Sequence, residues 1–387
     1  MPEHIGPRLR DLRKRRGLSQ QVLARESGVS LSTIRKLEQG EQNSPRMETV
    51  HRLAVALRVT TTHLFTRPVE PPTPAAEPWR ALQQAIEAPP VQPADEPDVD
   101  ATAAVLSAVR EAYFDNRLAD LTDMLAPLLR DVDALDEAKP EVQALHAHLL
   151  NLAGSVLTQV HAYDSAETAL RRALDVAPDR LRSASVVTTW VWLLMRQGRL
   201  AEAREMAARW ADDLEPRVSR ATAEDLAAWG WVLTQFSAAS LRDARHGEAK
   251  DAMRLARGAA TLIGRELPRG RSRLATWGPV TVAYKTAERG IMLDRPDVVL
   301  ETAARLEATS PAESTEHHRH RLDVANAHTM MRQYPEAAEV LYGVWERAPE
   351  WLAQQRYAQD IVDQVVTGRR TLTPEMRLLA DATGLPL

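Results

Sequence analysis

Apolar residues recur three and four residues apart over most of this 387-residue chain, and this helical period constrains its fold more than any other feature. From residue 101 to the C-terminus, no run alternates apolar and polar residues as a half-buried strand would. Hydrophobic residues make up 44% of the chain, which is enough to bury a large core. The pattern therefore predicts an all-α protein.

The helical pattern repeats along the C-terminal part. Residues 147–180 place small, bulky and proline residues at the spacing of a two-helix unit, and this spacing returns at 299–311 and 337–349. Residues 223–263 fit it in no clear register. Such units bury their apolar faces only against neighbouring units, so a stack of them forms a superhelix with a concave surface. We expect five to seven units. The spaced residues of the first unit are Gly154, Ala166, Leu170, Ala173 and Pro178.

A proline-rich acidic segment separates this body from the N-terminal part. Residues 68–100 hold nine of the 24 prolines, seven acidic residues and one arginine. Proline removes a backbone donor and restricts its neighbours, so most of the segment cannot be regular structure. One short helix is expected over 79–87, with Trp79, Leu82 and Ile86 on one face. The segment is either a mobile spacer or a docking segment, and it divides the chain into 1–67, 68–100 and 101–387.

Charge is divided unequally between these parts. Residues 1–67 carry 13 Lys and Arg against 6 Asp and Glu, whereas the rest of the chain carries 36 against 47. The head is thus net +7 and the remainder net −11, within a total of −4. A small basic module joined to a larger acidic one is typical of a nucleic-acid-binding head on a domain with another task.

The head reads as about five short helices. Ser19 and Ser30 are predicted N-caps of the second and third helices, and Gly28 permits the tight turn between them. Two further helices are expected at 47–57 and 61–65. Apolar and small residues in register with this pattern include Leu9, Leu12, Leu23, Ala24, Val29, Ile34, Leu37, Leu53, Ala54, Leu57, Val59, Leu64 and Phe65.

These positions resemble the lambda-repressor/Cro-like (Xre) family of helix-turn-helix transcriptional regulators. The resemblance implies a five-helix DNA-binding domain whose third helix enters the major groove, and a homodimer on a palindromic operator. It implies a structural ion pair between Arg13 and Glu38. Leu31 and Ser32 stand where many members carry long amide side chains, so no known operator sequence transfers to this chain.

The same resemblance implies the residues that contact double-stranded DNA. Lys36 would donate to guanine, Leu31 would touch a thymine methyl group, and Gln20 would hold a phosphate beside the second helix. The full expected set is Gln20, Ser30, Leu31, Ser32, Thr33, Arg35, Lys36, Gln39, Asn43 and Arg46.

A head of this kind followed by tetratricopeptide-like repeats resembles the RRNPP-type peptide-sensing regulators of bacterial quorum sensing. It also resembles Xre regulators with repeat domains from GC-rich, antibiotic-producing bacteria. The resemblance implies that the body is a sensor and dimerisation domain that binds a short signalling peptide. Two alternatives remain open: the body could hold a partner protein as a DNA-tethered adaptor, or it could serve only for dimerisation.

The first helix of each unit would line the concave face. Amide side chains there suit a peptide backbone, and cations could hold a terminal carboxylate. The paired tryptophans 190/192 and 229/231 are either core residues or an aromatic wall, and at most one of each pair need line a cavity. The expected ligand-binding residues are Asn151, Gln159, Trp192, Arg196, Tyr284, Lys285, Arg319 and Asn326.

Catalysis, metals and cofactors are not expected. The chain has no cysteine, no phosphate-cradling glycine loop, no nucleophile elbow and no HExxH. His317, His320 and Asp323 have metal-ligand spacing, but Arg319 would repel a cation. With no apolar run of membrane-spanning length and no signal peptide at the N-terminus, we expect a cytoplasmic protein.

Overall fold

A computed structural model of the chain describes residues 5–16, 18–40, 47–57, 78–87, 97–268, 270, 274–307 and 315–385. Twenty helices lie in these ranges, and the β-type pairing within them is a single bridge between Leu267 and Trp277. The prediction of an all-α protein is confirmed. None of the described helices combines the length and the apolarity that a membrane crossing requires.

The head begins with α1 (Ile5–Arg15), α2 (Gln20–Ser27), α3 (Leu31–Glu38) and α4 (Met47–Ala56). The hydroxyl of Ser19 accepts the amide of Val22 at 3.1 Å, and Ser30 caps α3 in the same way. Gly28 adopts φ 62° between the two helices, as its predicted turn requires. Both predicted caps are therefore confirmed, whereas the helix expected at 61–65 lies outside the described residues.

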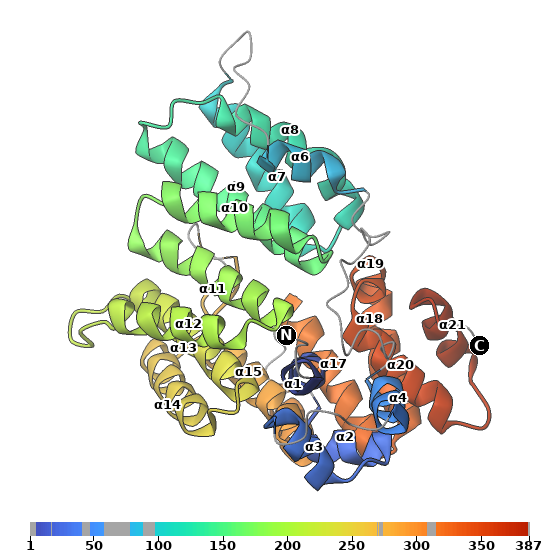
Figure 1. The fold of residues 1–387 in the computed structure, drawn as a ribbon. Coiled ribbons are helices and arrows are strands. Elements are labelled where there is room, and N and C mark those ends of the chain that lie inside the picture. Colours follow the sequence, from blue (N-terminus) through green and yellow to red (C-terminus); the bar gives the residue numbers. More distant parts are fainter. Residues whose placement is uncertain are drawn as a thin grey trace.

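The body is built from helical hairpins that stack in chain order (Figure 1). From α7 to α18, each odd-numbered helix packs against the next even-numbered one, and the odd helices α9, α11, α13, α15 and α17 also pack against one another in succession. The hairpins thus curve into an arc of the kind that the repeats predicted. The helices are α7 (Val99–Phe114), α8 (Leu118–Asp133), α9 (Pro140–Gln159), α10 (Tyr163–Val176), α11 (Arg180–Gln197), α12 (Leu200–Leu214), α13 (Ala223–Arg242), α14 (His246–Ile263), α15 (Pro279–Met292), α16 (Pro296–Glu307), α17 (Thr315–Met330), α18 (Tyr334–Arg347), α19 (Pro349–Ala353), α20 (Arg356–Gly368) and α21 (Pro374–Ala382).

One turn geometry recurs in all six hairpins from α7 to α18. One or two residues after the end of the first helix, a residue has a left-handed φ between 57° and 77°, and the next residue donates its N–H to the carbonyl five residues back at 2.8–2.9 Å. This pattern is the 6→1 bond of a Schellman C-cap, and it sends the chain back along the first helix. The left-handed residues are Asn116, His161, Gly198, Ala244, Asp294 and Arg332.

Small residues bring the packed helices close together. A Cβ on Gly154 of α9 would lie 2.6 Å from the Leu170 side chain of α10, so only glycine allows this approach. Gly230 of α13 does the same for the ring of Trp277, which is fully buried. The prediction that small residues set the helix approach in residues 147–180 is therefore confirmed at Gly154. The segment 223–263, whose register the sequence left open, is the hairpin α13–α14.

The short helix expected in the proline-rich segment is α6 (Arg80–Glu87). Its predicted apolar face is buried, with Trp79, Leu82 and Ile86 each at most 4% exposed, and it packs against α8 and α10. Ser165 donates to the Glu87 carboxylate at 2.8 Å, and Arg172 donates to the carbonyl of Ile86 at 3.0 Å. This helix is therefore docked on the body and adds to its core.

Candidate DNA-binding face and effector cavity

The outer face of α3 is free to meet another molecule. Ile34 and Leu37 are buried in the head, whereas Ser32, Arg35 and Lys36 are exposed on the opposite side of the helix. Leu31 and Thr33 are half-buried at its N-terminus, beside the exposed cap Ser30, and exposed Gln39 follows its last turn. The helix thus presents a polar, basic face while its apolar stripe fixes its orientation.

A buried ion pair ties this helix to α1. Arg13 binds Glu38 through two hydrogen bonds, of 2.6 and 2.8 Å, and both side chains are at most 10% exposed. The amide of Gln20 donates to the same carboxylate at 2.8 Å. The pair expected from the family resemblance is present. Gln20, expected at a phosphate, holds Glu38 in this structure, and the expected DNA contacts Asn43 and Arg46 lie outside the described residues.

The concave side of the body contains a cavity of about 1690 Å³. Trp192 of α11 and Trp231 of α13 lie on its wall, whereas their neighbours Trp190 and Trp229 are buried among core residues. One tryptophan of each pair therefore lines the cavity, which is the arrangement that their spacing on a helix allows. The wall also carries amide side chains, from Gln159, Gln235, Asn326, Gln355, Gln359 and Gln364 among others.

Six of the eight residues expected to bind a ligand lie on this wall, and two do not. Asn151 is buried and donates to the Ser185 hydroxyl at 3.0 Å, so its amide serves the packing of α9 on α11. Tyr284 is buried as well, with its hydroxyl 3.1 Å from His317. The residues on the wall are Gln159, Trp192, Arg196, Lys285, Arg319 and Asn326.

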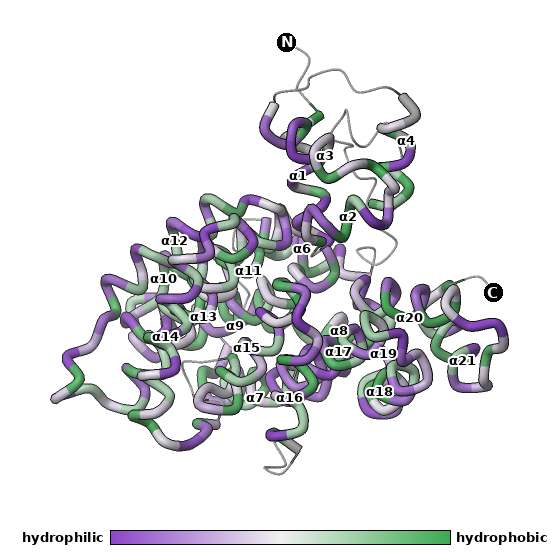
Figure 2. Tube along the Cα trace, turned by 90° about the horizontal axis from the view of Figure 1, so that it is seen from below, coloured by the Kyte–Doolittle hydropathy of each residue, from purple (hydrophilic) through white to green (hydrophobic). Residues whose placement is uncertain are grey.

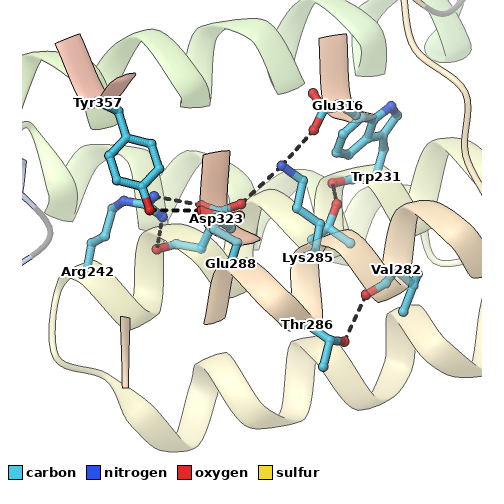
Figure 3. Close-up of polar contacts among 11 residues, drawn as sticks. Trp231, Arg242, Val282, Lys285, Thr286, Glu288, Glu316, Asp323 and Tyr357 are labelled. Atoms are coloured by element: carbon cyan, nitrogen blue, oxygen red, sulfur yellow. Dashed lines mark hydrogen bonds and ion pairs between the residues drawn. The ribbon is translucent and has the colours of Figure 1, made fainter. Parts of the chain in front are cut away.

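A network of charged groups crosses the cavity wall between α13, α15 and α17 (Figure 3). The Lys285 ammonium lies 3.2 Å from Glu288, 3.0 Å from Glu316 and 5.5 Å from the centre of the Trp231 ring. Arg242 pairs with Glu288 at 2.7 Å. Burial by itself would lower the pKa of Lys285, but the two carboxylates raise the pKa above its ordinary value. The lysine is therefore protonated, and its positive charge is balanced by the two carboxylates.

Asp323 behaves differently from these carboxylates. Its carboxylate accepts a hydrogen bond of 3.2 Å from the hydroxyl of Tyr357, which lies on α20. Burial, and then the nearby charge of Glu288, raise the pKa of Asp323 to about 8. At neutral pH this carboxyl is therefore mostly protonated, and the wall carries one negative charge fewer than its composition indicates.

Two arginines of the wall stand apart from the charged network. Arg319 of α17 reaches across to α11, where its guanidinium lies 5.1 Å from the centre of the Trp192 ring. One turn further along α11, Arg196 lies 3.0 Å from Nε2 of His161. Burial, together with the charge of Arg196, lowers the pKa of His161 to about 4, so this imidazole is neutral.

The head lies against the body (Figure 2). Residues of α1 and α2 form part of the wall of the same cavity. Lys14 lies 3.3 Å from Asp243, and Arg16 lies 2.7 Å from Asp360. Sequence analysis did not predict these contacts, because the two residues of each pair lie more than 200 residues apart and the basic run of α1 suits DNA equally well. The opposite charges of head and body were the available signal.

The histidines near the start of α17 show no metal-binding arrangement. His320 stacks on Tyr284 with ring centres 4.7 Å apart, and burial lowers its pKa to about 3. Across the described residues, no three His, Asp or Glu side chains are grouped so that they could hold a metal ion.

Comparison with known proteins identifies a family to which the head is similar. Residues 4–64 match the family described as "Helix-turn-helix domain". The chain is 39% identical over 88 residues to the HTH-type transcriptional regulator SlrR of Bacillus subtilis (strain 168), and 42% identical over 55 residues to the uncharacterized HTH-type transcriptional regulator RghRB of the same organism. These matches span 58% and 40% of the two relatives but only 22% and 14% of this chain.

A solved structure is also similar over a longer stretch. The crystal structure of Bacillus thuringiensis PlcR in complex with the peptide PapR7 and DNA aligns with 80% of this chain and 99% of its own, at 15% identity and a TM-score of 0.37. The match to the helix-turn-helix family, by contrast, is placed within the head, at residues 4–64. Residues 4–64 of this chain are therefore a helix-turn-helix domain, joined in one polypeptide to an all-helical body.

Proposed function

We propose that the protein is a sequence-specific DNA-binding transcriptional regulator whose body binds an effector and passes the signal to the head. The exposed basic face of α3 and the names of the two sequence relatives support DNA binding. In this proposal residues 1–67 read DNA, 68–100 connect, and 101–387 sense the effector. The protein acts as a homodimer on a palindromic operator, because two heads one helical turn apart would match its half-sites.

The cavity that body and head share is the observation that carries the sensing role. Its volume of about 1690 Å³ exceeds the roughly 300–1,000 Å³ of sites for drug-sized molecules, so it suits a larger ligand. Its amide side chains can each donate to and accept from a peptide backbone. Among the described residues, the buried amide oxygen of Gln159 has no hydrogen-bond partner, and it would gain one from a peptide N–H. We propose a short signalling peptide as the effector.

The walls of the cavity also favour an effector over the adaptor alternative. A partner protein would be expected to use a broad polar groove, whereas here Trp192 and Trp231 face a common space. Because α1 and α2 contribute to that space, occupancy would alter how the head sits on the body. A ligand that changes head position changes the spacing of two heads in a dimer, which is coupling between two sites.

DNA binding is tested at Lys36. An operator is first selected from random DNA with the full-length protein, and its Kd is measured for the wild type, Lys36→Ala and the control Lys139→Ala. Lys36→Ala should weaken binding by about 1–3 kcal/mol, since a base contact is lost. Lys139 is exposed at the start of α9, far along the chain from the head, and its variant should bind as the wild type does. Equal affinity of all three proteins would refute the assignment of α3.

The effector is tested by native mass spectrometry of the protein isolated from its own cells. A bound mass of roughly five to ten residues, released on mild activation, would establish a peptide receptor and also report the oligomeric state. A bare dimer would leave dimerisation as the role of the body. A co-purifying protein chain in place of a peptide would identify an adaptor.

A further inference from the structure

We propose that Arg196 and Arg319 form a carboxylate-binding subsite in the cavity, and that the effector peptide docks its C-terminal carboxylate there. This inference rests on the proposed peptide effector and adds its orientation and its required chemistry. It follows from how charge is distributed over the cavity wall.

The cations of the network between α13, α15 and α17 are already neutralised. Lys285 is shared by Glu288 and Glu316, and Arg242 is held by Glu288. Two cations and two carboxylates therefore balance one another within that network. The sequence pattern placed Lys285 among the candidate anchors for a ligand carboxylate. A carboxylate would have to break existing ion pairs to bind there, so Lys285 is excluded as an anchor.

Arg196 and Arg319 have no such compensation. In the part of the chain that the structure describes, neither guanidinium has a carboxylate within ion-pair distance. The close partners of Arg196 include the side chain of Tyr163 and the imidazole of His161, which is neutral because its pKa lies at about 4. Burial lowers the pKa of Arg196, and the charge of Arg319 lowers it further, although Tyr163 acts in the opposite direction. Two like charges thus share one side of the cavity without an anion between them.

The surroundings fit a carboxylate ligand better than a neutral one. A guanidinium donates two parallel N–H groups that match the two oxygens of a carboxylate. Arg319 is held over the Trp192 ring, which limits its rotamers before a ligand arrives. Asp323, one turn along α17 from Arg319, is mostly protonated at neutral pH and does not compete for the guanidinium. The geometry therefore supplies two positioned forks and an excess of positive charge.

The proposal is tested with two pools of random heptapeptides, one with free C-termini and one amidated. The full-length protein is incubated with each pool, and retained peptides are counted by native mass spectrometry. We expect retention of the free-acid pool to exceed that of the amidated pool by about tenfold or more, the usual value of a charge-assisted hydrogen-bond pair. Equal retention of both pools would overturn the subsite while leaving a peptide receptor in place.

A matched pair of variants locates the effect. Arg319→Gln should lose the preference for free acids, whereas Arg254→Gln should keep it, because Arg254 lies on α14 with its side chain 76% exposed. A preference that survives Arg319→Gln would overturn the assignment to this residue. Failure of the wild type to retain any peptide from either pool would remove the peptide effector itself, and with it the subsite. The comparison of pools on the wild type holds even if a variant folds poorly.

Discussion

Asp323 is a buried carboxyl group whose protonation links stability to pH. Its pKa of about 8 in the folded protein lies far above the ordinary value of 3.8, because burial and the charge of Glu288 disfavour its ionised form. Below the ordinary pKa the group is protonated in both folded and unfolded protein. Between the two values only the folded protein holds the proton. Folding stability therefore falls as pH rises from about 4 towards 8.

Asp323→Asn removes this titration and leaves an amide oxygen that can still accept from Tyr357. The stability of the variant relative to the wild type should rise by about 1 kcal/mol per pH unit between pH 5 and 7.5. Urea unfolding of both proteins at pH 5, 6 and 7.5 measures the difference. Asp131→Asn, at an exposed position on α8, is the control and should show no such slope. A pH-independent difference for Asp323→Asn would contradict the assignment.

Single residues were also where prediction from the sequence was weakest. The helical period placed Asn151 and Tyr284 on the concave face, but the first is hydrogen-bonded to Ser185 and the second to His317 inside the packed hairpins. The helical period also could not tell that Lys285 is ion-paired whereas Arg196 is not, because the partners of Lys285, Glu288 and Glu316, are brought to it by the fold. A periodic pattern gives the face of a helix, whereas the charge state of a side chain depends on neighbours from other helices.

At the scale of elements, the repeated turn shows what local pattern could and could not supply. Ser19 and Ser30 were predicted as caps because a serine hydroxyl accepts a hydrogen bond from the adjacent backbone. Gly28 was predicted at the turn because a residue without a side chain adopts a left-handed φ easily. The left-handed turns of the body follow the same rule, yet only Gly198 among the six is a glycine. Asn116 and Asp294 are of types that tolerate this conformation. His161, Ala244 and Arg332 carry a backbone cost that the hairpin packing offsets, so no single residue type marks all six turns in the sequence.

Ala244 offers a test of that cost. It has φ 63° and an exposed side chain in the turn between α13 and α14. Ala244→Gly should stabilise the protein by about 0.5–1 kcal/mol, because relief of the left-handed strain exceeds the added freedom of the unfolded chain. Thermal unfolding compares it with Ala104→Gly, an exposed site inside α7, which should destabilise by about 1 kcal/mol. Destabilisation at both sites would show that the turn carries no such strain.

At the scale of the whole molecule, head and body are held together by few ionic contacts. Asp243 receives Lys14 from the head and Arg204 from the body, and Asp360 receives Arg16. The Lys14 and Arg16 side chains of these pairs are only 6% and 13% exposed, so added salt screens the pairs less than it would screen pairs on the surface. Removing the two carboxylates should therefore leave the head less firmly held on the body.

The absence of cysteine from the chain makes this directly measurable. Spin labels at Ser32→Cys on α3 and Lys250→Cys on α14 would be the only two in the protein, since both sites are exposed and no native thiol competes. The double variant Asp243→Asn and Asp360→Asn should broaden the distance distribution between the two labels, because Lys14 and Arg16 lose their carboxylate partners. Asp297→Asn, which breaks an exposed pair within the body, is the control. An unchanged distribution in the double variant would mean that other contacts fix the head.

The presence of α1 and α2 on the cavity wall affects the dissociation rate of a ligand as well as its affinity. A ligand beneath the head can leave only along paths that the head does not obstruct, so its residence time would depend on how often the head rocks away. Two ion pairs between head and body, rather than the cavity wall itself, would then govern how long a ligand stays bound after its supply has ended.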